Sequence, residues 1–98
     1  MSLSLAGVTL DIDAQGSLQP NSEYYLEMVL SSGTLGATVR LWIGEKSDVG
    51  SMKTKADEHG DHYHAHLMVL SKVDSNTALW VEVRTLKGEV GLGKIALQ

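Results

Sequence analysis

Hydrophobic and polar residues alternate along most of this chain with a period of two. In the run 23–30, for example, Tyr24, Leu26, Met28 and Leu30 occupy every second position. An extended chain points successive side chains to opposite faces, so this pattern gives each strand one apolar face. The alternation predicts an all-β protein with no helix longer than a turn.

Turn signals return about every ten residues and divide the alternation into seven runs, a spacing typical of a sandwich or barrel. One run is short and polar and carries lysines, which predicts an edge strand that avoids pairing with other molecules. The segment 57–60 that follows this run is expected to be a turn. The seven expected strands cover residues 8–13, 23–30, 37–43, 50–55, 62–69, 79–84 and 90–97.

Seven antiparallel strands with one apolar face each pack best as two sheets face to face. The predicted fold class is therefore an all-β, seven-stranded antiparallel immunoglobulin-like sandwich, with 8–13, 23–30, 62–69 and 50–55 in one sheet. The remaining three runs form the other sheet. The expected core residues are Leu10, Leu26, Met28, Val39, Leu41, Tyr63, Leu67, Leu79, Val81 and Val83.

Two features of this pattern qualify the predicted sandwich. The chain has no cysteine, and Trp42 in the run 37–43 falls on the outward row, so an antibody-type domain is not expected. Gly91 and Gly93 in the last run predict a bulge or a close approach of another segment.

Composition limits the classes of function. The 98 residues, 43% apolar and 20% charged, fit one globular domain spanning 1–98. The net charge of −4 and the lack of a basic cluster argue against nucleic acid as a partner. No run approaches the ~20 apolar residues of a membrane span, so no transmembrane segment is expected in this chain. Removal of a signal or anchor segment from a longer protein remains open.

Part of the chain resembles a known group of bacterial domains. The segments 37–41, 60–67 and 79–83, with Tyr63, Ala65 and Leu67 on a strand after a glycine and a later strand led by an aromatic residue, resemble YtkA-like and FixH-like domains. The resemblance implies a small sandwich in the periplasm or another extracytoplasmic place, as a domain of a larger or processed protein, often in a metal-handling context. The prolines usual in the group's hinge regions are absent, since Pro20 is the only proline of the chain, and no residue roles carry over.

Histidines alternate along the run 62–69 and supply the candidate metal site. His62, His64 and His66 project from one face, with ~6.8 Å between successive positions. Glu27 shares that face if 23–30 is the neighbouring strand, and imidazole with carboxylate suits Zn²⁺, Cu²⁺ or Ni²⁺. The predicted ligands are His62, His64, His66 and Glu27, with Zn or Cu as the candidate cofactor. Replacing the central His64 should weaken binding more than replacing His59 in the preceding loop.

Two alternatives to this metal site stay open. In the first, the histidines are solvated and the chain is a purely structural sandwich module with no metal. In the second, a cupin-like metalloenzyme uses the His62-x-His64 pair, but the Glu and the later His of such a site are missing at the needed spacing. A nucleophile elbow is missing as well. We therefore expect no catalytic residue and no enzyme activity.

The two tryptophans are the second candidate site. Trp42 and Trp80 lie on outward rows of neighbouring strands, which predicts an exposed cross-strand pair. Such a patch usually marks an interface, here with a protein partner or a second copy in a homodimer. Alternatively, the stems of Arg40, Arg84 and Lys94 cover the rings. The expected function is an accessory or interaction domain of a bacterial envelope protein that docks through this face.

Overall fold

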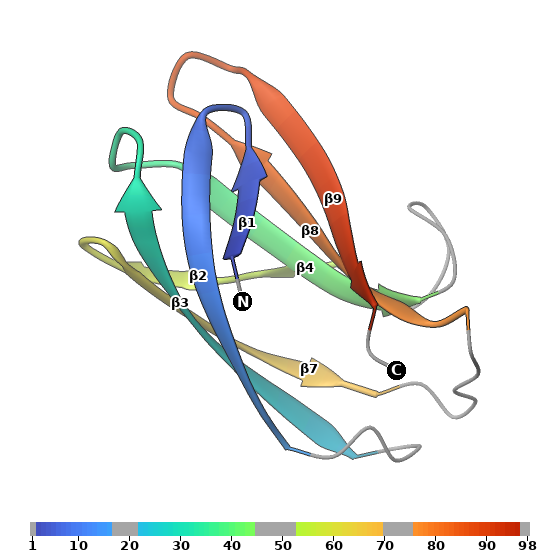
Figure 1. Ribbon diagram of the computed structural model, residues 1–98. Coiled ribbons are helices and arrows are strands. Elements are labelled where there is room, and N and C mark those ends of the chain that lie inside the picture. Colours follow the sequence, from blue (N-terminus) through green and yellow to red (C-terminus); the bar gives the residue numbers. More distant parts are fainter. Residues whose placement is uncertain (1, 17–21, 45–52, 70–75, 97–98) are drawn as a thin grey trace.

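The computed structural model describes residues 2–16, 22–44, 53–69 and 76–96 (Figure 1). These residues form strands and turns, with no helix among them, so the prediction of an all-β chain is confirmed. Nine strands follow one another within the described ranges: β1 (Ser2–Leu5), β2 (Val8–Gly16), β3 (Glu23–Ser32), β4 (Thr38–Gly44), β5 (Thr54–Lys55), β6 (Asp57–His59), β7 (His62–Met68), β8 (Ala78–Arg84) and β9 (Val90–Ala96).

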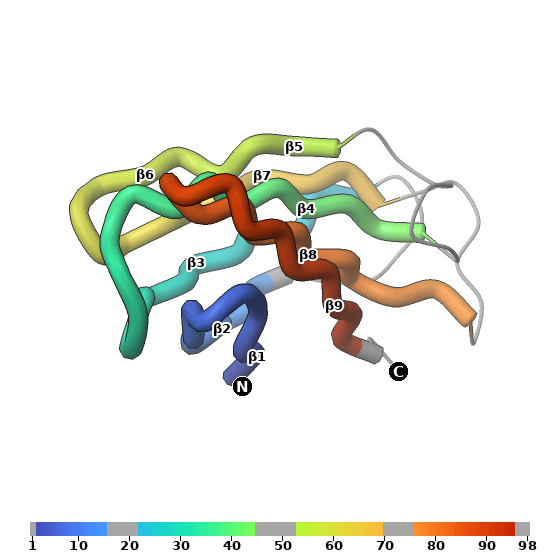
Figure 2. Tube along the Cα trace, turned by 90° about the horizontal axis from the view of Figure 1, so that it is seen from above, coloured from blue at the N-terminus to red at the C-terminus, as the bar shows by residue number. Residues whose placement is uncertain are grey.

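The strands form two antiparallel sheets. One has the order β1-β2-β3-β7-β6 and the other β5-β4-β8-β9. The apolar rows of both sheets belong to one hydrophobic cluster, so the sheets pack face to face in a sandwich-like arrangement. Figure 2 shows β1 beside β9 at one side of the molecule, where the edges of the two sheets meet.

The described strands differ from the seven expected ones in three places. Residues 2–5 form an additional strand, β1, which turns back onto β2 through Ala6 and Gly7. Residues 57–59, expected as a turn, form β6 and pair with β7. The edge strand expected over 50–55 is confirmed only at Thr54–Lys55, and it pairs with β4 in the other sheet. Residues 50–52 lie outside the described residues.

The core follows the period-two rows. All ten residues expected in the core are buried, and Leu26, Leu41, Val81 and Val83 are fully enclosed. A slip of one residue in any strand would expose its whole row, so the burial fixes the register. The alternate residues face outward from each sheet, and both candidate sites lie on these outer faces.

Tyr63 ties β7 to the start of β4. Its hydroxyl donates a hydrogen bond to the carbonyl oxygen of Ala37 at 2.8 Å, and a carboxylate oxygen of Glu58 lies 3.3 Å from the same hydroxyl. Burial raises the pKa of Tyr63 to about 12, and the nearby Glu58 acts in the same direction. The phenol therefore stays neutral at physiological pH and holds the two sheets together at this point.

The glycines of β9 make room for β1, as their positions in the sequence predicted. A Cβ added at Gly91 would lie 2.9 Å from Leu5 Cβ, and one at Gly93 would lie 3.1 Å from Leu5 Cδ2. Leu3 and Leu5 are partly buried side chains packed against the core. Glycine in β9 thus lets the leucines of β1 close one side of the sandwich.

Candidate functional site

All four histidines of the chain lie on the outer face of the β3-β7-β6 part of the first sheet. His62, His64 and His66 alternate with buried residues along β7, as predicted. His59, expected in a turn, instead lies on β6 directly opposite His62. We call this surface, formed by the four histidines together with Glu23, Glu27, Asp57 and Asp61, the histidine face.

His64 is the centre of the histidine face. Its backbone position pairs with Glu27 on β3 and with Asp57 on β6, so one carboxylate flanks it on each side. The distance from His64 Nδ1 to Asp57 Oδ2 is 3.8 Å. The ring of His59 stacks on that of His64, with 5.3 Å between centroids and 7° between planes. His64 is half-buried, with 34% of its side chain exposed.

His62 and His66 turn to carboxylates of their own. His62 Nε2 lies 3.4 Å from Asp61 Oδ1, and His66 Nδ1 forms a hydrogen bond with Glu23 Oε1. The ring of Tyr25 lies 4.6 Å from that of His66. In an extended strand, residues four positions apart are ~13 Å apart, so His62 and His66 cannot share one ion.

The four predicted ligands therefore do not lie together in the structure. His64 and Glu27 remain neighbours, whereas His62 and His66 lie at the two ends of the row. Asp57 and His59 take their place beside His64. In the described ranges, no three His, Asp or Glu side chains already converge on one point as ligands of an ion. The structure brings together two imidazoles flanked by two carboxylates rather than the predicted row of three imidazoles.

The sequence contained a signal for β6, the strand that carries Asp57 and His59. Gly60 and Asp61 form a two-residue connection between His59 and His62, and Gly60 has a φ of +66°. A Gly-Asp dipeptide between two extended runs is typical of a tight hairpin. The residues before it, Asp57, Glu58 and His59, contain no apolar row, so alternation alone could not identify them as a strand.

The tryptophans form the predicted cross-strand pair. Trp42 and Trp80 are directly opposite in register, and their rings stack with 6.3 Å between centroids. The indole nitrogen of Trp80 donates a hydrogen bond to the carbonyl oxygen of Gly44 at 3.1 Å. The pairing of neighbouring outward positions on β4 and β8 is thereby confirmed.

The expectation that both rings are exposed is wrong for Trp42, which is only 1% exposed. The ammonium of Lys53, from the segment before β5, lies 4.6 Å from the centre of the Trp42 ring. The ammonium of Lys94 lies 5.6 Å from the centre of the Trp80 ring, so one of the three residues expected to cover the rings lies over one of them. Among the apolar side chains on the outer face of this sheet, Trp80, Val90 and Leu92 remain at least partly accessible.

Comparison with known proteins gives no relative from which to assign a role. No family model, no curated protein and no solved structure matches the chain. The resemblance to YtkA-like and FixH-like domains therefore remains an expectation from the sequence. The part of the chain that the structure describes contains no helix long and apolar enough to cross a membrane.

Proposed function

We propose that this chain is a non-enzymatic accessory or interaction domain that binds one divalent metal ion, Zn²⁺ or Cu²⁺, on its histidine face. The observation that carries the proposal is the stacking of His59 on His64 between Asp57 and Glu27. Two imidazoles and two carboxylates are sufficient to complete a tetrahedral zinc shell. They come from three neighbouring strands of one sheet, which holds their backbones in place.

The ion would draw the four side chains together. Metal–nitrogen bonds of ~2.0 Å require the two ligating nitrogens to lie about 3 to 4 Å apart. Stacked rings reach that spacing when one of them rotates about its side-chain torsions. His59, Asp57 and Glu27 are exposed, so they can rotate without disturbing the core. The hydroxyl of Tyr25, 3.2 Å from Glu27 Oε1, donates a hydrogen bond that orients this carboxylate from outside.

Calorimetric titration with ZnCl₂ and CuCl₂ tests this proposal. The intact chain should bind one ion, and His59→Ala or His64→Ala should weaken binding at least about tenfold, since even outer partners of metal ligands contribute that much. His66→Ala is the matched control, because His66 is exposed on the same strand and contacts Glu23 instead. Absence of binding, or an equal loss in His66→Ala, would leave the purely structural module as the better description.

The strand orders support an immunoglobulin-like topology as part of the same proposal. In that assignment β2-β3-β7-β6 corresponds to the sheet A-B-E-D and β5-β4-β8-β9 to C′-C-F-G, with β1 added at the edge. A cupin-like enzyme would need its metal inside a barrel, whereas the interior here is filled by apolar side chains. The resemblance noted in the sequence favours an extracytoplasmic location in a bacterial envelope protein.

A further inference from the structure

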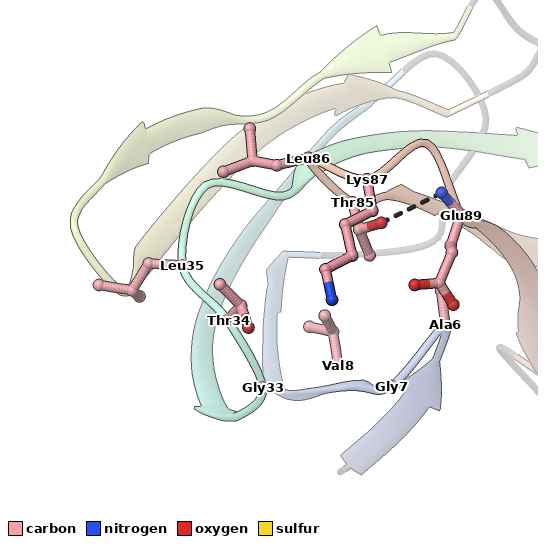
Figure 3. Close-up of a pocket in the computed structure, with 10 residues that line it drawn as sticks. All are labelled: Ala6, Gly7, Val8, Gly33, Thr34, Leu35, Thr85, Leu86, Lys87 and Glu89. Carbon is pink, nitrogen blue, oxygen red and sulfur yellow. Dashed lines mark hydrogen bonds between the residues drawn. The ribbon is translucent and has the colours of Figure 1, made fainter.

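A cavity of about 410 Å³ lies at one end of the sandwich (Figure 3). Three connections line it: the turn 6–7 between β1 and β2, the loop after β3 that begins at Gly33, and the turn 85–89 between β8 and β9. The volume falls in the range of pockets that hold small molecules. None of its lining residues takes part in the proposed metal site.

The three connections are held against one another, so the cavity is already formed. A Cβ at Gly33 would lie 2.8 Å from the carbonyl oxygen of Gly7, and one at Gly36 would lie 2.7 Å from Leu86 Cδ1. The contact at Gly33 is with backbone, whereas that at Gly36 is with the end of a flexible side chain. Each of these contacts joins the loop after β3 to one of the other two connections.

The turn between β8 and β9 is closed by three hydrogen bonds. The Thr85 amide donates to the Glu89 carbonyl oxygen at 2.9 Å, and the Gly88 amide donates to the Thr85 carbonyl oxygen at 3.0 Å. The Glu89 amide donates to Thr85 Oγ1 at 3.1 Å. These bonds fix the backbone positions from which the side chains of Lys87 and Glu89 extend.

Part of the cavity lining is apolar. The lining includes Val8, a buried core residue, and two leucines, Leu35 and Leu86, with exposures of 52% and 78%. Leu86 is the most exposed large hydrophobic side chain among the described residues. A branched aliphatic group placed here would bury part of this apolar surface.

The lining also carries one positive and one negative side chain. Figure 3 shows the ammonium of Lys87 and the carboxylate of Glu89 both pointing from the β8–β9 turn toward the β1–β2 turn. Neither side chain belongs to an ion pair with another described residue. Each therefore has its charge available to a ligand.

We propose that this cavity binds a small aliphatic zwitterion, either a free branched-chain amino acid or a short apolar peptide with both termini free. The ligand's carboxylate pairs with Lys87, its ammonium pairs with Glu89, and its aliphatic side chain lies against the apolar part of the lining. A fatty acid would match Lys87 but would bring a second negative charge beside Glu89. An internal segment of a longer chain has neither a free ammonium nor a free carboxylate, so it would leave Lys87 and Glu89 without partners.

Nuclear magnetic resonance titration of the ¹⁵N-labelled chain tests the proposal. The probes are L-leucine, the dipeptide Leu-Leu, N-acetyl-L-leucine, which lacks the ammonium, and L-leucinamide, which lacks the carboxylate. Leucine or the dipeptide should shift the amides of Gly7, Gly33 and Gly88 saturably, with a dissociation constant on the order of millimolar, and should leave Gly44 unchanged. Whichever of the two binds tighter identifies the source of the zwitterion.

Two charge variants and one pair of leucine variants complete the test. Lys87→Met should bring the affinity for leucine down to that for leucinamide, and Glu89→Gln should bring it down to that for N-acetyl-leucine. Each loss should be roughly two- to fivefold, as for other exposed charge pairs. Leu86→Ala should weaken binding, whereas Leu92→Ala, another exposed leucine at a distant site, should not.

Three results would overturn the proposal. The first is the absence of saturable shifts with either zwitterion up to its solubility limit. The second is equal binding of leucine, N-acetyl-leucine and leucinamide by the unmodified chain, which needs no variant to fold. The third is an unchanged affinity in both charge variants. A failure here leaves the metal proposal untouched, because the titration is carried out without metal.

Discussion

The imidazole ring of His59 lies parallel to that of His64, although a hairpin turn separates the two residues in the sequence. This relationship changes the role of His59 from a loop residue to a neighbour of the central histidine. The sequence alone predicts that replacing His59 affects metal binding less than replacing His64. The structure instead leads us to expect similar losses for the two, and His66 becomes the appropriate control.

Metal binding should depend on pH. Imidazole ligates a metal only in its neutral form, so protons compete with the ion as the pH falls. Zn²⁺ affinity should therefore be lower at about pH 5.5 than at about pH 7.5. Calorimetry at the two values measures this. An affinity that does not change with pH would show that carboxylates alone hold the ion and would remove His59 and His64 from the ligand set.

The stability of the fold should fall at alkaline pH because of Tyr63. Burial disfavours the phenolate and raises the pKa of Tyr63 from its ordinary value of 10.0 to about 12 in the folded chain. The folded state thus holds its proton more tightly, and this part of the stability is complete below pH 10 and is lost as the pH rises toward 12. After allowance for solvent screening, the loss should reach roughly 1 to 2 kcal/mol in the free energy of unfolding.

Tyr63→Phe separates this effect from the titration of the other tyrosines. At neutral pH the variant should be less stable by about 1 to 2 kcal/mol, because the buried carbonyl of Ala37 loses its donor. Its stability should then fall less than that of the parent between pH 10 and 12. Urea unfolding at several pH values measures both. Parallel curves for parent and variant would contradict the assignment to Tyr63.

The two glycines of β9 should differ in their tolerance of alanine. A methyl at Gly91 meets the Ala6 amide nitrogen and Leu5 Cβ, both at 2.9 Å, and neither atom can move without shifting the backbone of β1. A methyl at Gly93 meets only the ends of leucine side chains, which can turn aside. Gly91→Ala should lower the free energy of unfolding by about 1 to 3 kcal/mol and Gly93→Ala by less. Denaturant titration of both variants measures these losses. A larger loss for Gly93→Ala than for Gly91→Ala would contradict this packing.

Any association through the tryptophan-bearing sheet should use Trp80 and Leu92 rather than Trp42, which is buried within the chain. If this face forms a homodimer, Leu92→Glu should abolish the dimer and leave the fold intact, because Leu92 is exposed. Leu86→Glu, at the end of the sandwich, serves as the control. Analytical ultracentrifugation measures the association. A parent chain that is monomeric at high concentration would exclude self-association and leave only a different protein as partner.

The period-two rows predicted the core because burial on one face of a strand is a local property of the sequence. Leu26 and Leu41 are buried for the reason that the alternation gives. Exposure on the outer faces could not be predicted in the same way. Trp42 does face outward from its strand, yet Lys53 and Trp80, which cover it, come from other parts of the chain.

For the candidate sites too, alternation predicted the face on which a residue lies but not the groups that it contacts. Alternation correctly placed His62, His64 and His66 on one face and Glu27 on the same outer surface. It could not show that Asp61 and Glu23 engage the outer two histidines, because side-chain torsions decide which carboxylate each imidazole meets. The cavity was not foreseen, since it depends on three connections that are distant in the sequence and meet only in the folded chain.

The packing of Leu3 and Leu5 on Gly91 and Gly93 has a consequence for the time course of folding. This seam joins strands separated by nearly the whole described sequence, and contacts of such long range form slowly because a large loop must close first. During synthesis, β1 and β2 leave the ribosome long before β9 exists. The leucines of β1 therefore stay uncovered until synthesis has passed β9, and in that interval a chaperone, or β9 of another copy, could take the place of the chain's own last strand.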